Sequence, residues 1–350
     1  MKRLIAILIA IIFTFSCSDE DKQPKNVDQI LILGRSTVSP MHSYYWRNDY
    51  LEEVILSNGY VNNIVAKSYS SNQLHLQLVD KTIEGNPFRY AFYKDGKQTE
   101  IEDLKGSILT GYRQIDNKDY IFSFRFGTPF QSFYWSGNEI EYLATQDNNY
   151  ATDLTIDNIG NTHVIGAKGI FKSEGSVWEP IYWINMIPQS LNFDYPLNGE
   201  FVRIENINDE IHIIGIAYDH DNEKRIIFDI VNGITNILME TSFSDGALSL
   251  NNVTVEGNDL YICGAFKSYN GDSYGFYIKN NEVVKVTNPS SSYVFSDIAV
   301  INDQIHLIGY SYPKGNENVI SSLYLIDGIT QSKSGIPDLA LNQIKFLPKQ

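Results

Sequence analysis

A short motif that recurs along the chain limits its possible folds more than any other feature of the sequence. The motif begins with a turn-forming Asn or Asp, continues with an apolar run and ends with Gly, as in NDEIHIIG at Asn208–Gly215. Related copies begin at Asn302, at Gly257 and, less closely, at Asn161. A unit repeated every 20 to 50 residues or so is typical of solenoids and propellers. The chain is therefore expected to consist of similar units, each too small to fold alone.

Three sets of equivalent positions each recur seven times along the chain. The first set marks the His of the motif and comprises Leu31, His75, Ile121, His163, His212, Tyr261 and His306. The second set lies on the run after the motif and comprises Trp46, Tyr93, Trp135, Trp183, Ile230, Ile278 and Leu325. The third set opens each unit with a polar residue and comprises Asn63, Ser107, Asp153, Arg203, Asn252, Asp297 and Gln343. The sequence therefore predicts seven units.

Each unit has the pattern of four antiparallel strands. Short β-branched or aromatic runs are separated by turn residues, and hairpin dipeptides occur at Asp95-Gly96, Asn232-Gly233 and Asp327-Gly328. Asn-Gly and Asp-Gly provide the positive φ angles that a type I′ turn needs. In the sixth unit the expected strands are 253–256, 260–265, 275–279 and 282–287. Four strands in a unit of about 45 residues are typical of a propeller blade, so we expect an all-β, seven-bladed β-propeller.

The two ends of the repeat array predict how the ring closes. The first unit begins at what should be its second strand, residues 30–33, whereas residues 342–347 match the first strand of a unit. The C-terminal strand is therefore expected to be the innermost strand of blade one, where it would pair an otherwise open sheet edge. No linker divides the body, so we expect one propeller domain over residues 28–350.

The N-terminal residues resemble the signal of a bacterial lipoprotein. Lys2 and Arg3 precede a short apolar run that ends in Ser16-Cys17, the order of a secretory signal. The residues before Cys17 resemble a lipobox, which implies removal of residues 1–16 and lipidation of Cys17, for example with palmitate. Ordinary signal cleavage beside an incidental Cys is the alternative. Residues 17–27 are expected to form a flexible acidic tether, because they are polar and aperiodic.

The repeats also resemble a group of propeller-like lipoproteins of Bacteroidota with degenerate, kelch-like units. The residues that carry this resemblance are 132–135, 182–183, 232–233, 257–264 and 327–328. Together with the acidic run after Cys17, it implies lipid anchoring in the outer membrane, facing the cell exterior. Blades two and three depart from the pattern, because the Gly that ends the motif is missing there. The resemblance implies a fold and an address, and no activity.

The charge of the chain limits its partners. The net charge is −15, and removal of Lys2 and Arg3 with the signal makes it −17. An acidic surface repels nucleic acid phosphates and anionic lipids, so we expect no nucleic-acid partner and membrane attachment only through the lipid. Once Cys17 is modified, Cys263 is the only remaining thiol, and its apolar neighbours predict a buried side chain.

The sequence contains no pattern that carries a known chemistry. A phosphate-binding Gly-rich loop, a Cys/His zinc spacing and a G-x-S-x-G elbow are all absent, so we predict no catalytic residue, no metal and no cofactor. Residues 219–223 are acidic but lack the Gly and the ligand spacing of a calcium loop. The His and Trp residues of the repeated positions are expected to be packing elements between blades.

Binding groups are expected on one face of the ring and along its axis. The connections between second and third strands, such as 168–179 and 218–225, differ in length and share one face, where variable loops on a rigid scaffold bind partners. The candidate ligand-binding residues in or beside these connections are Trp178, His220, Asp219, Arg225, Arg35 and His42. The third set of repeated positions is expected to line the central channel.

Two classes of function fit these observations. The first is a non-catalytic cell-surface lipoprotein whose propeller binds a protein or a glycan. The alternative is a secreted carbohydrate-active hydrolase or lyase with its chemistry at the axis, where Asp153 and Asp297 would form the acid–base pair. A deep axial pocket with converging acid and base groups would favour the enzyme.

Overall fold

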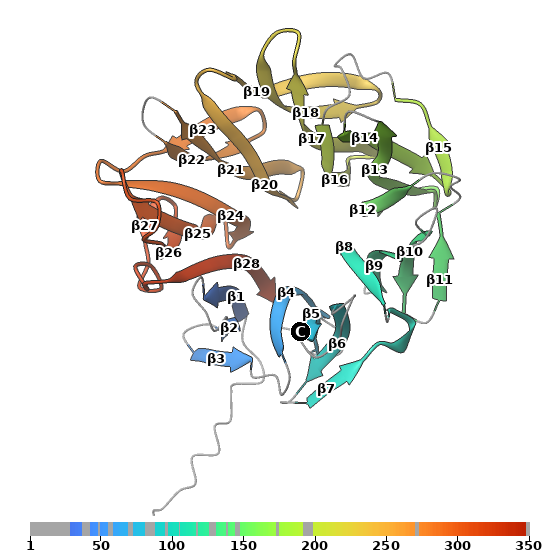
Figure 1. Ribbon diagram of the computed structural model, residues 1–350, viewed down its shortest axis with the longest axis horizontal. Coiled ribbons are helices and arrows are strands. Elements are labelled where there is room, and N and C mark those ends of the chain that lie inside the picture. The colour runs from blue at the N-terminus through green and yellow to red at the C-terminus, as the bar shows by residue number, and fades with distance from the viewer. Residues whose placement is uncertain are drawn as a thin grey trace, which may run out of the picture.

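In a computed structural model, the chain forms four-stranded antiparallel sheets arranged around a central axis (Figure 1). The structure describes residues 29–347 except 37–42, 48–49, 55–58, 69–72, 81–87, 95–96, 105, 117, 126–130, 138, 144–147, 173–174, 192–198 and 270–272. Throughout β3 to β7 it describes the backbone. The predicted signal and tether, with Cys17, His42 and the Asp95-Gly96 turn, lie outside the described residues. Within the described ranges, no helix is long and apolar enough to cross a membrane.

The first four sheets come from residues 29–189 and the last strand of the chain. Sheet one consists of β28 (Leu339–Leu347), β1 (Gln29–Ser36), β2 (Ser43–Arg47) and β3 (Tyr50–Val54). Sheet two consists of β4 (Gly59–Ser68), β5 (Gln73–Asp80), β6 (Phe88–Lys94) and β7 (Lys97–Glu100). Sheet three consists of β8 (Ser107–Ile115), β9 (Lys118–Arg125), β10 (Gln131–Ser136) and β11 (Glu139–Tyr142). Sheet four consists of β12 (Asn149–Ile156), β13 (Thr162–Lys172), β14 (Gly175–Ile184) and β15 (Ile187–Gln189).

The remaining three sheets follow in chain order. Sheet five consists of β16 (Gly199–Ile207), β17 (Glu210–Asp219), β18 (Lys224–Val231) and β19 (Ile234–Ser242). Sheet six consists of β20 (Gly246–Glu256), β21 (Asp259–Ser268), β22 (Tyr274–Lys279) and β23 (Glu282–Val286). Sheet seven consists of β24 (Ser291–Ile301), β25 (Gln304–Pro313), β26 (Ser321–Ile326) and β27 (Ile329–Thr330). A single turn of 3₁₀-helix, η2 (Glu102–Leu104), precedes sheet three.

The C-terminal strand completes the first sheet, as the sequence predicts. β28 pairs antiparallel with β1 from Gln29 opposite Leu347 to Ser36 opposite Leu339. It also contacts β24, the innermost strand of the last sheet. The two ends of the described chain are therefore held together by backbone hydrogen bonds, and the inner edge of β1 is covered.

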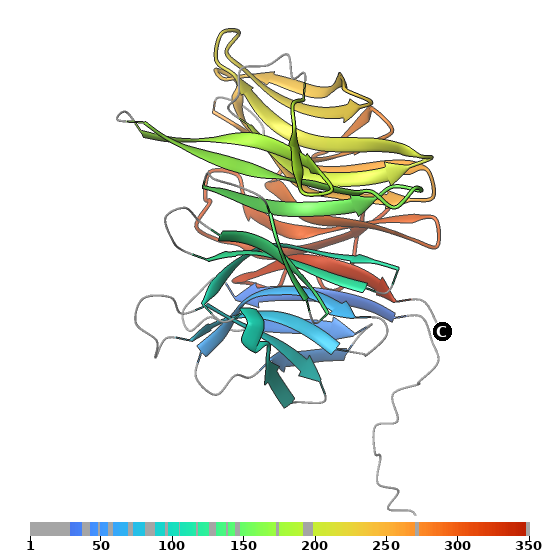
Figure 2. The same ribbon diagram turned by 90° about the vertical axis from the view of Figure 1, so that its right-hand side faces the viewer.

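The hydrophobic core lies between neighbouring sheets, not within one of them. One cluster joins Ile214 and Ile227 of sheet five to Phe276 and Ile278 of sheet six. Another joins sheets seven and one through residues such as Ile308 and Trp46. Because each sheet buries its faces against its two neighbours, a single unit would expose an apolar surface on both sides. Figure 2 shows the sheets stacked in this way from the side.

A β-bulge occurs at the same place in every innermost strand. The residues left without a partner in the ladder are Asn62, Thr110, Thr152, Val202, Asn251, Ser296 and Asn342. An extra residue bends its strand and changes which side chains point to each face beyond it. The bulges therefore reverse the alternation halfway along the strand. In β20, for example, Leu248 and Leu250 before the bulge and Val253 after it are all buried.

The bulge also explains the Gly that ends the sequence motif. Gly264 on β21 lies opposite Leu250, the residue just before the bulge of β20. A Cβ atom at Gly264 would overlap the carbonyl oxygen of Ser249 and the ring of Phe276. Gly166, Gly215 and Gly309 occupy the equivalent place in their sheets. The backbones approach so closely here that no side chain fits.

The other repeated positions have the structural roles that the sequence predicts. Trp46, Trp135 and Trp183 are buried, as is the free thiol of Cys263. His163 and His306 form hydrogen bonds with Tyr182 and Tyr324 on the next strand. The Asn232-Gly233 and Asp327-Gly328 turns have positive φ at both residues.

Two predicted boundaries are wrong. The expected loop at 168–179 is largely a β-hairpin, because β13 and β14 pair from His163 opposite Ile184 to Lys172 opposite Gly175. The innermost strand of the sixth unit begins at Gly246 rather than at Val253. The reversal of alternation at the bulge hides the first half of that strand in the sequence.

Candidate functional site

A cavity of about 730 Å³ lies on the central axis, where the innermost strands converge. The described residues that line it come from sheets one and three to seven, and these walls are mostly polar. The residues from the third repeated set that line it are Asp153, Arg203, Asn252, Asp297 and Gln343. Its volume falls within the roughly 300–1,000 Å³ typical of small-molecule sites.

Among the described side chains of the third set, Ser107 departs from this pattern. Ser107 is fully buried and its hydroxyl donates a hydrogen bond to the carbonyl oxygen of Leu104, so it does not line the cavity. The equivalent place in that sheet belongs to Thr110 and Gly111, at the bulge of β8. The prediction for Ser107 is wrong because it took the start of the strand for the residue that follows the bulge. The side chain of Asn63 lies outside the described part of the structure.

The cavity lies at the level of the bulges, about midway along the innermost strands. It is lined by residues 250–252 of β20 (Gly246–Glu256) and 296–297 of β24 (Ser291–Ile301). On β16 the lining extends to Glu200, which is exposed near the start of the strand. Gly199 there pairs with Ala217 near the end of β17, so Glu200 lies at the end of its sheet where the connection between second and third strands begins.

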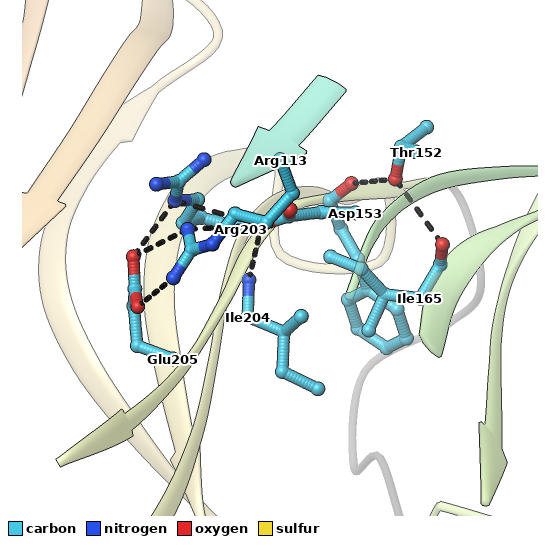
Figure 3. Close-up of polar contacts among 8 residues, drawn as sticks. Arg113, Thr152, Asp153, Ile165, Arg203, Ile204 and Glu205 are labelled. Atoms are coloured by element: carbon cyan, nitrogen blue, oxygen red, sulfur yellow. Dashed lines mark hydrogen bonds and ion pairs between the residues drawn. The ribbon is translucent and has the colours of Figure 1, made fainter. Parts of the chain in front are cut away.

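Four charged side chains from three sheets form a network beside the cavity (Figure 3). Arg113 of β8 forms a bidentate ion pair with Glu205 of β16. Its Nη1 donates to Oε1 at 2.8 Å and its Nη2 donates to Oε2. Arg203 Nε donates to the same Oε1 at 2.8 Å. Asp153 of β12 lies between them, with its Oδ2 3.8 Å from Arg113 Nη1 and 3.5 Å from Arg203 Nε.

The two carboxylates of this network have opposite pKa shifts. Burial alone would raise the pKa of Glu205, but the charges and hydrogen bonds of Arg203 and Arg113 lower it to about 2. For Asp153 burial dominates and raises the pKa, although the same two arginines oppose the shift. The two carboxylates differ because Glu205 accepts hydrogen bonds from both Nη atoms of Arg113 and from Nε of Arg203. Glu205 is therefore the fixed counter-charge of the arginines.

Asp153 and Asp297 also connect neighbouring sheets. Asp153 Oδ2 accepts a hydrogen bond from the backbone N–H of Ile204 on β16 at 3.1 Å. Asp297 Oδ2 accepts one from Ile344 N–H on β28 at 2.8 Å, and its Oδ1 accepts from Asn252 and from Ile298 N–H. Both carboxylates thus receive donors from an adjacent innermost strand. One oxygen, Asp153 Oδ1, is buried and has no donor among the described residues.

The bulge residues make a second set of connections around the axis. Thr110 donates to the carbonyl oxygen of Ala151, and Thr152 Oγ1 lies 3.4 Å from that of Phe201. Asn251 Nδ2 donates to the carbonyl oxygen of Phe295 at 2.6 Å. In each case the acceptor is the residue before the bulge in the next sheet. The polar residues at the axis therefore stabilise the contacts between sheets as well as lining the cavity.

The candidate residues from the connections whose side chains the structure describes do not form a single cluster. Arg35 lines the axial cavity. Asp219 is buried and holds its own turn by accepting from Asn222, and His220 is exposed with its ring against Phe243. Arg225 stacks on the same Phe243 ring and donates to the carbonyl oxygen of Gly246. Trp178 lies in the hairpin opposite Gly169, and its side chain is outside the described part.

Arg113 and Glu205 are functional candidates that the sequence reading missed. Glu205 follows Arg203 by two residues on one strand, so both point to the same face. This spacing of two residues could have indicated the site, because a Glu and an Arg on the same inner face of a strand are expected to form buried ion pairs. The contribution of Arg113 could not be found in this way, since it comes from a sheet two places away. Among the described side chains, no group of three or more His, Cys, Asp or Glu is placed to hold a metal ion.

Comparison with known proteins shows likeness in fold. No family model and no curated protein matches the chain. It is similar to a Mycobacterium tuberculosis puromycin-hydrolysing peptidase, with 10% identity, a TM-score of 0.54 and coverage of 86% of this chain and 52% of that one. A puromycin hydrolase is similar at 10% identity and TM-score 0.54, covering 89% and 52%. The fucose-binding Aleuria aurantia lectin has 11% identity, a TM-score of 0.41 and coverage of 82% and 95%.

The chain spans about half the length of the two hydrolases. At these identities the likeness shows an all-β, propeller-like fold alone.

Proposed function

We propose that this protein is a lipid-anchored, non-catalytic β-propeller that binds a protein or glycan partner on the face surrounding the axial cavity. In this proposal the seven sheets close into a ring of seven blades and Cys17 carries the anchor in the outer membrane. The observation that supports it best is the polar axial cavity, whose lining reaches Glu200 at the end of sheet five where the connection between β17 and β18 begins.

The state of the carboxylates favours binding over catalysis. Acid–base hydrolysis of a glycan needs two carboxyl groups that are free to exchange protons on either side of the bond. Asp297 receives three donors, and Glu205 is held by two arginines. These groups are committed to the contacts between sheets, as expected of a rigid scaffold.

A direct binding assay tests this proposal. The mature protein would be screened against purified polysaccharides and outer-membrane proteins, and the partner identified by its affinity in titration. Replacing Glu200, which lines the cavity and is exposed, by Lys should weaken that binding by about tenfold or more. Glu139→Lys on β11, at the outer edge of its sheet, is the matched control and should leave the affinity unchanged. Equal affinities of both variants would reject this face.

The anchor has a separate test. Cys17→Ser should abolish incorporation of labelled palmitate and release the protein from the membrane fraction. Protease added to intact cells should degrade the wild-type protein if it faces the exterior. Retention of the Cys17→Ser variant in the membrane would reject lipid anchoring without affecting the proposed binding face.

One observation favours the hydrolase or lyase alternative. Asp153 lines the cavity, has a raised pKa and has one oxygen without a donor among the described residues, which are properties of a general acid. If the protein degrades a polysaccharide, Asp153→Asn should abolish turnover while substrate binding persists. Turnover that survives in Asp153→Asn and in Asp297→Asn would exclude this alternative.

A further inference from the structure

The axial cavity contains an arginine whose outer end is not used by the protein. Both contacts of Arg203 with the neighbouring carboxylates go through Nε. Its two Nη groups form no hydrogen bond with the described residues, and no dashed line reaches them in Figure 3. A guanidinium held at Nε presents its two Nη groups as a planar pair of donors, which matches the two oxygens of a carboxylate.

Two buried acceptor atoms of residues that line the same cavity also lack a donor among the described residues. They are Oδ1 of Asp153, a residue only 3% exposed, and Oε1 of Gln343 on the innermost strand of sheet one. Buried polar atoms are nearly always satisfied, so each calls for a donor that the described side chains do not supply. A ligand that satisfies these two atoms must carry O–H or N–H groups.

From these two observations we infer that the axial cavity binds an acidic saccharide, with the carboxylate of a uronic acid on the Nη pair of Arg203 and sugar hydroxyls donating to Asp153 and Gln343. This inference rests on the proposed binding function and names the ligand chemistry of that site. The cavity lining contains two arginines, Arg35 and Arg203, and three acidic residues, Asp153, Glu200 and Asp297, so the anionic group of a ligand must lie against the arginines.

The acceptors distinguish a uronic acid from simpler ligands. Inorganic phosphate would suit the Arg203 pair, but it would lie near the Asp153 carboxylate and offer few donors to the buried acceptors. A neutral sugar would satisfy the acceptors, but its hydroxyl oxygens would accept only uncharged hydrogen bonds from the Arg203 pair. A ligand with both an anionic group and several hydroxyls adds an ion pair at Arg203 to the hydrogen bonds at the acceptors.

Calorimetric titration of the mature protein with D-glucuronate and D-galacturonate tests the inference. D-Glucose, which lacks the carboxylate, and acetate, which lacks the hydroxyls, are the matched ligands. We expect at least one uronate to bind at least about tenfold more tightly than either control. Added salt should weaken uronate binding, because the central contact is an ion pair.

Two arginine variants complete the test. Arg203→Lys keeps the charge but loses the paired donors, and should weaken uronate binding by at least about tenfold. Arg125→Lys on β9, the same substitution outside the cavity lining, should bind as the wild type does. Unchanged binding by Arg203→Lys, or binding of glucose by the wild type as tight as that of both uronates, would overturn the inference. The ligand comparison needs no variant and therefore holds even if Arg203→Lys folds poorly.

The two proposals fail in different ways. If the wild type binds neither uronate at concentrations up to about 10 mM but does bind a partner in the screen described above, the acidic-saccharide inference falls and the binding function stands. If the wild type binds nothing in either experiment, both fall.

Discussion

Replacing Glu205 by Gln tests whether the charge network stabilises the contacts among three sheets. Glu205 accepts two hydrogen bonds from Arg113 and one from Arg203, and it is 7% exposed. Gln has the same shape, but one oxygen becomes an NH₂ group that would face the arginine donors. The substitution therefore removes the counter-charge and introduces a donor against a donor, without opening a cavity.

The structure gives a magnitude for this loss. The pKa of Glu205 is lowered from 4.5 to about 2, a difference equivalent to roughly 3 kcal/mol in favour of the ionised form in the folded protein. Breaking a buried ion pair by removing one partner costs about 3–5 kcal/mol in other proteins. We therefore expect Glu205→Gln to lower the free energy of unfolding by about 3 kcal/mol at neutral pH.

Urea unfolding of the wild type and the variant at a series of pH values measures this difference. A carboxyl group with a lowered pKa in the folded state stabilises it above its unfolded pKa, 4.5, and loses that contribution as the pH falls through about 2. The stability gap between wild type and Glu205→Gln should therefore be full at pH 7 and should shrink below about pH 4.5.

The matched control is Glu240→Gln. Glu240 pairs with Lys224 at 2.9 Å on the surface, and both side chains are more than 40% exposed. An exposed pair of this kind contributes about 0–1 kcal/mol. If Glu205→Gln costs no more than Glu240→Gln, or if its cost does not depend on pH, the network does not stabilise the fold as argued.

Three further outcomes follow from the fold. Gly264→Ala should lower the free energy of unfolding by about 2 kcal/mol, because its Cβ meets the Ser249 carbonyl oxygen, and an unchanged urea midpoint would contradict this. Deleting residues 339–350 removes β28 and exposes the edge of β1, so size-exclusion chromatography should show aggregation; a stable monomer would refute the closure argument. The pKa of His212 should lie above 6.5 by NMR titration, because Asp229 bonds to its ring, and Asp229→Asn should lower it. The pair's contribution to stability is present below pH 6.5 and is lost as the pH rises through the raised pKa.

The repeat predicts the fold class because each copy contains the turn residues and the Gly that one four-stranded sheet needs. Asn232-Gly233 supplies a turn that only positive φ permits, and the motif Gly stands where two backbones meet. Each requirement lies within one unit, so the spacing of such residues predicts strands, hairpins and the number of sheets. The pairing of β28 with β1 follows from the same pattern, because an incomplete first unit needs the strand found at the other end.

The candidate site was predictable only in part. Asp153, Arg203 and Asp297 recur at one place in the repeat, which was enough to put them on the axis. The bulge in each innermost strand breaks the alternation of inward and outward side chains. The sequence therefore places Ser107 at the axis, several residues before Thr110 and Gly111, which line the cavity. The hairpin at β13 and β14 was mistaken for a loop because its length departs from that of the other units.

The sequence by itself determined the repeat, its four strands, the turns between them and five of the residues that line the cavity, because these depend on neighbours along the chain. Only the tertiary structure shows that Arg113 pairs with Glu205 beside Asp153, and that Arg203 contacts Glu205 through Nε and not through its Nη groups. Those contacts join sheets whose residues are 92 positions apart in sequence. Their geometry depends on how the blades are arranged about the axis, which no local pattern records.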